Sequence, residues 1–132
     1  MTDSVDRLYE DVVAEQRADP SLSRTARLLQ AGRAKVAKKV AEEATEVVIE
    51  AIDGDRAAIV RESADLIYNL VVLWATSGVQ PRDVWKEMNR RERLFGIAEK
   101  LLKRQAAPKA RRKVAALAMR RLEKRQAKRR RA

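Results

Sequence analysis

The chain's architecture follows mainly from Lys38-Lys-Val-Ala-Glu-Glu-Ala-Thr-Glu-Val-Val-Ile-Glu-Ala-Ile-Asp-Gly-Asp55. Apolar residues recur here at spacings of three and four, which predicts one long helix over Arg33–Ile52. Asp53-Gly-Asp55 is a turn signal, and Asp55 is suited to cap a second helix over 56–77. We therefore expect two long antiparallel helices. The apolar stripe predicted for the first consists of Val36, Val40, Ala44, Val47, Val48 and Ala51.

Shorter helices are predicted on both sides of this pair. Gly is 4 and Pro is 3 in 132 residues, so few residues interrupt a helix, which favours an all-α fold. Pro20 and Gly32 are placed to separate the early helices. The expected elements are Ser4–Arg17, a short helix capped by Ser21 or Ser23, a helix that begins at Pro81 with Val84, Trp85 and Met88 inward, and Arg90–Leu102.

Composition excludes several kinds of chemistry. Cys is 0, so there is neither a disulfide framework nor a thiolate metal site. His is also 0, which removes the commonest general base and metal ligand. The most apolar stretch, Leu66–Ala75, contains Asn69 and is too short to span a membrane. The first ten residues do not resemble a secretory signal, so we expect a cytoplasmic protein without a membrane partner.

Charge divides the chain into two parts. Residues 1–100 carry 16 Lys+Arg and 18 Asp+Glu, whereas residues 101–132 carry 14 Lys+Arg and a single acid, Glu123. We therefore predict a domain over 1–100 and a basic helical or disordered tail over 101–132. Such a tail would contact polyanions without sequence specificity, because it has no aromatic residue for base stacking.

Four acids of the first long helix fall on one arc beside its apolar stripe. At about 100° per residue, they cover roughly 100° of the helix surface; they are Glu42, Glu43, Glu46 and Glu50. Like charges three or four residues apart repel one another, which weakens the helix. On their own, these acids fit a solvated face as well as they fit a functional site.

The second long helix adds Glu62, Asp65 and Asn69 on one side of an otherwise apolar segment. A buried carboxylate is unfavourable unless it is protonated, paired or bound to a metal. A salt bridge to Arg or Lys is one outcome. The other is a cage of carboxylates for Mg²⁺, which prefers oxygen ligands and bridges to substrate phosphates, with one carboxylate activating water.

The spacing of these acids resembles a known signature. Glu43-Ala-Thr-Glu46, then 15 residues, then Glu62-Ser-Ala-Asp65 is similar to the ExxE…ExxD motif of the all-alpha nucleotide pyrophosphatase superfamily, which includes MazG-type enzymes and dimeric dUTPases. Further strings resemble its phosphoribosyl-ATP pyrophosphatase family across roughly residues 5–92. They are Thr25-Ala-Arg-Leu-Leu29, Lys38–Val48, Asp53-Gly-Asp-Arg56 and Ala64-Asp-Leu-Ile-Tyr68.

The resemblance implies a role for each acid and for nearby cations. Mg²⁺ would be the cofactor, and its ligands would be Glu43, Glu46, Glu62 and Asp65. Glu42 would be a further ligand or a base, so the catalytic acids would be Glu42, Glu43 and Glu46. Lys38 and Lys39 would lie near the phosphates, unless they only pair with Glu42 and Glu43. Arg27 would contact a phosphate or ribose, unless it is simply a surface residue.

The implied reaction cleaves the alpha–beta phosphoanhydride of phosphoribosyl-ATP, the second step of histidine biosynthesis. The implied fold is a MazG-like helical hairpin that pairs into a four-helix bundle in a homodimer or larger homo-oligomer. A broad apolar face for this pairing is predicted from Ile67, Val71, Trp74 and Trp85.

The chain departs from the family pattern at three places. Ala41 stands where the family often has Gly, Asn69 stands where it often has His, and residues 93–132 extend past the family's usual end. Two alternative functions are therefore open. One is a house-cleaning pyrophosphatase that hydrolyses other nucleoside or deoxynucleoside triphosphates. The other is a nucleic-acid-binding protein that acts through the basic segment Lys109–Arg131.

Overall fold

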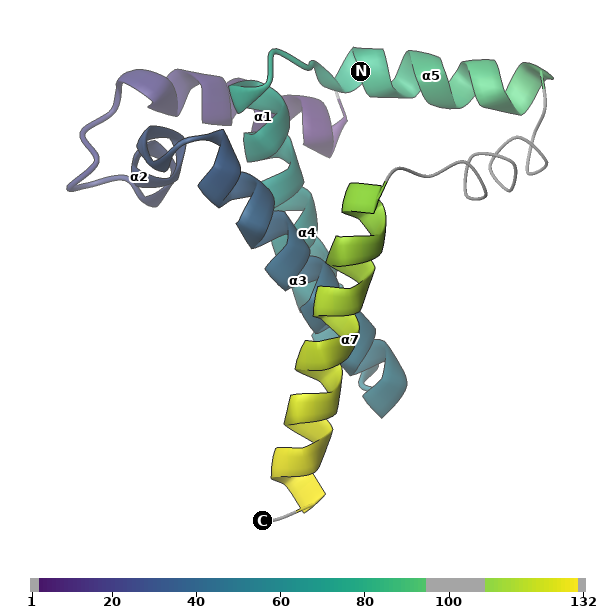
Figure 1. The fold of residues 1–132 in the computed structure, drawn as a ribbon. Helices are drawn as coiled ribbons and strands as arrows, with labels where there is room; N and C mark the ends of the chain where they lie inside the picture. The colour runs from purple at the N-terminus through teal and green to yellow at the C-terminus, as the bar shows by residue number, and fades with distance from the viewer. Residues whose placement is uncertain (1–2, 95–108, 131–132) are drawn as a thin grey trace. The chain divides into compact units, whose positions relative to one another are not determined.

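The computed structural model describes residues 3–94 and 109–130, and every regular element in these ranges is helical. This confirms the predicted all-α class (Figure 1). The elements are α1 (Ser4–Ala14), the 3₁₀ helix η1 (Glu15–Arg17), α2 (Arg24–Ala31), α3 (Arg33–Asp53), α4 (Arg56–Thr76), α5 (Pro81–Leu94) and α7 (Lys109–Arg130).

The chain divides into two units, Met1–Pro81 and Arg82–Ala132, which are described separately below. The domain boundary predicted between residues 100 and 101 lies outside the described residues, as does most of the helix predicted over Arg90–Leu102. That helix is seen as far as Leu94, within α5.

Local capping explains why the helices of the first unit begin and end where they do. The Ser23 hydroxyl accepts a hydrogen bond from the backbone N–H of Ala26 at 3.0 Å, and an Asp55 carboxylate oxygen accepts one from Ala58 at 3.0 Å. These bonds satisfy N–H groups that have no partner inside the helix. Gly54 ends α3 with a φ of 77°, a left-handed conformation that suits glycine. The predicted helix boundaries in this region are thus confirmed.

The core of the first unit lies at one end of the α3–α4 pair. Figure 1 shows α1 and α2 at the end of the pair that is remote from the turn at Gly54. Each of the four helices contributes a buried side chain to one cluster, which contains Val12, Leu28, Val36, Val71 and Val72. The turn end of the pair is less covered, since Val48, Ile52, Val60 and Ile67 there are all exposed by more than two-fifths.

The inner face of α3 differs from the predicted stripe. Val48 is 42% exposed and Ala51 is also exposed, whereas Thr45 and Ile49 are buried. Thr45 tolerates burial because its hydroxyl donates to the carbonyl of Ala41 at 2.8 Å, which leaves only its methyl group to pack. The face that meets the neighbouring helices is therefore rotated relative to the one that hydrophobicity alone predicts.

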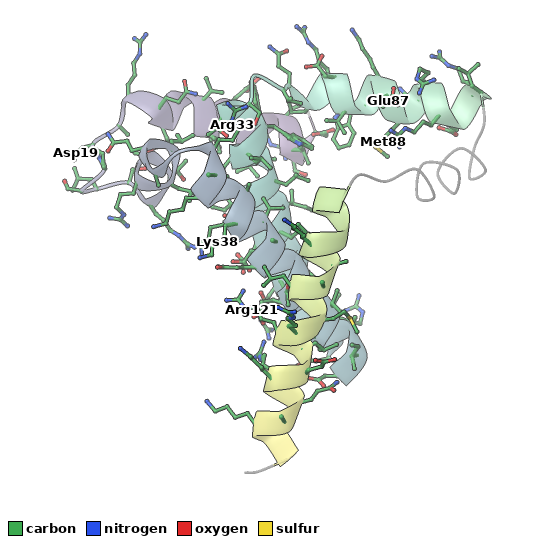
Figure 2. The ribbon with its side chains drawn as sticks, viewed as in Figure 1. Asp19, Arg33, Lys38, Glu87, Met88 and Arg121 are labelled. Atoms are coloured by element: carbon green, nitrogen blue, oxygen red, sulfur yellow. The ribbon has the colours of Figure 1, made fainter. Side chains whose placement is uncertain are left out.

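The predicted oligomer face was wrong at one residue. Val71 is fully buried in the chain's own core and is not available to a partner. Met88, predicted to face inward from α5, is 56% exposed (Figure 2). Both differences arise because sequence periodicity does not tell which neighbour covers an apolar side chain.

We expect Val71→Ala to lower the free energy of unfolding by about 2–3 kcal/mol, since two buried methyl groups are lost and a cavity is left. Leu22 is 87% exposed, so the control variant Leu22→Ala should change stability by no more than about 0.5 kcal/mol. Urea unfolding of both variants measures the difference. Equal losses would show that Val71 is not a core residue.

The second unit contains α5 and α7. In α5, the guanidinium groups of Arg90 and Arg91 each pair with the Glu87 carboxylate, at 2.8 Å and 2.9 Å. These hydrogen bonds hold the pKa of Glu87 well below its ordinary value. Within the described ranges, no helix is both long enough and apolar enough to cross a bilayer.

Candidate metal centre

Three of the predicted acids come together where α3 and α4 run side by side. Glu43 on α3 and Glu62 and Asp65 on α4 each offer a carboxylate oxygen, and these oxygens all lie within 4.8 Å of one another. The two helices are antiparallel neighbours joined by a short turn. Acids at positions i and i+3 of α4 lie on one face of that helix, so both can approach the same residue of α3. Glu43 and Glu62 are half-buried, and Asp65 is exposed.

The electrostatics of this cluster are unfavourable without a cation. The pKa of Glu43 is raised above its ordinary value, first by burial and then by the negative charges of Asp65, Glu62 and Glu46, although Lys39 partly opposes these effects. Burial and repulsion both disfavour the ionised carboxylate. A cation at this position would relieve both.

Lys39 lies next to the cluster. Its ammonium nitrogen is 3.9 Å from a carboxylate oxygen of Glu42 and 4.0 Å from one of Glu43. The pairing of Lys39 with Glu43 that the sequence left open is thus present. Lys38 is exposed and projects from α3, as Figure 2 shows. A contact of either lysine with a phosphate stays a prediction.

The remaining predicted residues, Glu46 and Arg27, are not part of the close group of three acids. Glu46 influences the pKa of Glu43 and therefore lies in its vicinity, but the close group within the described residues consists only of Glu43, Glu62 and Asp65. Arg27 is exposed on α2, where its guanidinium donates to the carbonyl of Pro20 at 3.3 Å. That bond does not engage the acids.

The donor set fits Mg²⁺. All three donors are carboxylate oxygens, the ligand type that this hard cation prefers. Two oxygens on opposite sides of one Mg²⁺, each bonded at about 2.1 Å, would lie roughly 4.2 Å apart, so a spread of up to 4.8 Å requires only small adjustments. The partial exposure of the cluster also leaves room for water and phosphate oxygens.

Two further contacts near the cluster were not predicted from the sequence. The Thr25 hydroxyl and the Tyr68 hydroxyl share a hydrogen bond of 2.6 Å, which ties α2 to α4 one turn from Asp65. Asn69 is buried, and its side-chain amide donates to the carbonyl of Asp65 at 2.8 Å. Thr25 and Tyr68 are 43 residues apart, and no local sequence pattern predicts a contact between them.

A separate cavity of about 520 Å³ lies at the other end of the long helices. Thr76 lines it, and along α4 Thr76 is roughly 16 Å from Asp65. The fully buried Val36 and Val72 lie between the two levels, so the cavity is not part of the acid cluster. Its polar lining consists of Gln16, Gln30, Arg33 and Thr76.

Within the described residues, fold and site together define an all-α protein whose helical hairpin carries a close group of three carboxylates that could hold a metal ion. The chain belongs to the phosphoribosyl-ATP pyrophosphohydrolase family, whose model matches residues 5–92, and is thus a phosphoanhydride hydrolase.

Relatives from three bacteria are similar over most of their length. Phosphoribosyl-ATP pyrophosphatase 2 of Rhodopseudomonas palustris is 62% identical over 117 residues, which cover 86% of this chain and 89% of the relative. Phosphoribosyl-ATP pyrophosphatase 2 of Bradyrhizobium diazoefficiens is 64% identical over 103 residues, covering 78% and 77%. Phosphoribosyl-ATP pyrophosphatase of Azospirillum brasilense is 55% identical over 96 residues, covering 73% and 86%.

Proposed function

We propose that this chain hydrolyses phosphoribosyl-ATP to phosphoribosyl-AMP and pyrophosphate, the second step of histidine biosynthesis. The observation that carries the proposal is the group of Glu43, Glu62 and Asp65 on a chain of this family. Three acids held close together are unfavourable in isolation and favourable around a cation that accompanies a triphosphate. A function in nucleic-acid binding through the basic tail would not explain why these three acids lie close together. A purely nucleic-acid-binding function is therefore disfavoured.

In the proposed reaction, the oxygen of a water molecule forms a bond to the alpha phosphorus. The bond between this phosphorus and the oxygen that bridges it to the beta phosphorus breaks, and pyrophosphate leaves with the bonding electrons. Glu43, Glu62 and Asp65 would hold Mg²⁺, with Glu46 as a further ligand. When bound, the ion neutralises phosphate oxygens and polarises the phosphorus that water attacks. Glu42 is the candidate to accept the proton of the attacking water, with Glu46 as the other acid in reach on α3.

Cations near the acids would bind the phosphate groups of the substrate. Lys39 is already held beside Glu42 and Glu43, so its ammonium is placed at the edge of the cluster. Lys38 precedes Lys39 on α3, and its exposed side chain can change rotamer to reach a bound phosphate. We assign both lysines to the phosphates and Arg27 to a phosphate or ribose at the rim.

We also propose that two or more copies associate through the turn end of the α3–α4 pair. Side chains that would gain from burial there are Val48, Ile52, Val60 and Ile67. Their pairing would complete a four-helix bundle. The basic tail would add non-specific contact with polyanions. We expect the enzyme to act in the cytoplasm, because its substrate is a phosphorylated metabolite.

The test of substrate choice is the release of pyrophosphate from phosphoribosyl-ATP, run beside ATP, dATP and other nucleoside triphosphates with Mg²⁺ present. We expect kcat/KM to be highest for phosphoribosyl-ATP. A preference for another triphosphate would keep the metal centre and move the function to nucleotide house-cleaning. Failure with every triphosphate would overturn the proposal.

A further inference from the structure

Asn69 is the most buried polar side chain in α4, with 1% of its surface exposed. It shares an arc of about 60° on this helix with Glu62 and Asp65, so all three project in the same direction. The amide nitrogen of Asn69 donates to the Asp65 carbonyl at 2.8 Å. The side chain is thereby fixed over the turn of α4 that carries Asp65.

The side-chain oxygen of the same amide lacks a hydrogen-bond donor within the described part of the chain. The side-chain oxygen of Asn69 is buried and has no hydrogen-bond partner among the residues that the structure describes. Rotating the amide by half a turn does not solve this, because its oxygen would then face the Asp65 carbonyl, which is also an acceptor. The fixed nitrogen therefore leaves the oxygen as a buried acceptor without a donor, on the side of α4 that also carries Glu62 and Asp65.

A buried acceptor without a donor is unfavourable, and its presence at a functional site calls for an explanation. An apolar residue of similar size, such as Leu, would fill the same space without this cost. The position is one helical turn, about 5.4 Å, beyond Asp65. Mg²⁺ that is bound by protein carboxylates keeps several of its water molecules, and such a water can donate a hydrogen bond to an acceptor in the next turn of the helix.

We propose that the side-chain oxygen of Asn69 accepts a hydrogen bond from a water molecule of the cation's shell, which makes Asn69 a positioning residue of the metal centre. This inference rests on the proposed cation site at Glu43, Glu62 and Asp65. It assigns to Asn69 a role in binding and orientation. Proton transfer is not part of it, because an amide does not titrate.

Asn69→Leu tests the inference with two readouts. We expect the metal-free variant to melt at a higher temperature than the wild type, since the open acceptor is removed. We also expect the Mg²⁺ concentration for half-maximal turnover to rise by about tenfold, as for other residues that support metal ligands. The rise in melting temperature on adding Mg²⁺ should become smaller. An unchanged Mg²⁺ requirement, or a lower melting temperature of the metal-free variant, would overturn the inference.

Two further variants separate positioning from packing. Asn69→His retains a donor for the Asp65 carbonyl and an acceptor on the second ring nitrogen, so it should restore the Mg²⁺ requirement toward the wild-type value. Thr45→Val is the matched control, because Thr45 is equally buried and its hydroxyl is already bonded to Ala41. It should lower the melting temperature and leave the Mg²⁺ requirement unchanged.

The failure of this inference is distinguishable from the failure of the proposed function. If Mg²⁺ affects neither the melting temperature nor the turnover of the wild type, the cation site itself is wrong. If the wild type responds to Mg²⁺ and Asn69→Leu responds equally, only the role of Asn69 is wrong. A shift in the Mg²⁺ requirement for Asn69→Leu that Thr45→Val does not share supports the proposal.

Discussion

Asp65→Asn should lower kcat for phosphoribosyl-ATP by about 100-fold or more, while the protein remains folded. The substitution converts one carboxylate group of the acid cluster into a neutral amide group of nearly the same size. A loss of roughly 3 kcal/mol in stabilisation of the transition state corresponds to this factor, and a cation held on phosphate oxygens supplies several kcal/mol. Asp65 is exposed, so the substitution should have little effect on packing.

Steady-state pyrophosphate release and thermal unfolding, measured on the same preparation, check this prediction. Glu50→Gln is the control, because it neutralises an acid on α3 outside the close group of three. It should retain wild-type turnover. Turnover of Asp65→Asn that is comparable to the wild type would show that the acid cluster is not the metal centre.

Glu43→Gln should have opposite effects on stability and activity. At neutral pH the ionised Glu43 is disfavoured by burial and by Asp65, Glu62 and Glu46, so neutralising it should stabilise the metal-free protein. Because the site is partly exposed and solvent screens the charges, the gain should be on the order of 0.5 kcal/mol. Turnover should fall as strongly as in Asp65→Asn, and Mg²⁺ should no longer raise the melting temperature.

The pH dependence of this stability difference has a definite sign. The pKa of Glu43 is higher in the folded protein than its ordinary value of 4.5. The folded wild type therefore binds more protons than the unfolded chain above pH 4.5, and its stability relative to Glu43→Gln falls as the pH rises through the folded pKa. Below pH 4.5 the two proteins should converge. A difference that grows toward low pH would contradict the repulsion inferred at Glu43.

The helical hairpin was predictable because its determinants are local. Asp55 and Gly54 mark the turn between the long helices, and the capping bond of Asp55 reaches only three residues along the chain. The juxtaposition of Glu43 with Glu62 and Asp65 follows almost directly, since an antiparallel pair with a short turn brings these levels together. The resemblance to the ExxE…ExxD motif pointed to the same residues.

Features that depend on helix packing or on hydrogen bonds of buried polar side chains were not predictable. Thr45 is buried because its hydroxyl bonds to Ala41, a compensation that a hydrophobicity pattern does not register. Val71 was assigned to a partner's interface, whereas α1 and the other helices of the first unit already cover it. Asn69 looked like an interruption of an apolar helix, and only its burial and its bond to Asp65 reveal the open acceptor.

We propose that the acids on α3 and α4 hold a cation that hydrolysis of phosphoribosyl-ATP requires. The most direct test is the rate of pyrophosphate release from phosphoribosyl-ATP by the wild type, measured in Mg²⁺ and again after chelation of divalent cations. We predict turnover that requires Mg²⁺ and returns when Mg²⁺ is restored. Equal turnover in chelator, or no pyrophosphate release in either condition, would contradict the claim.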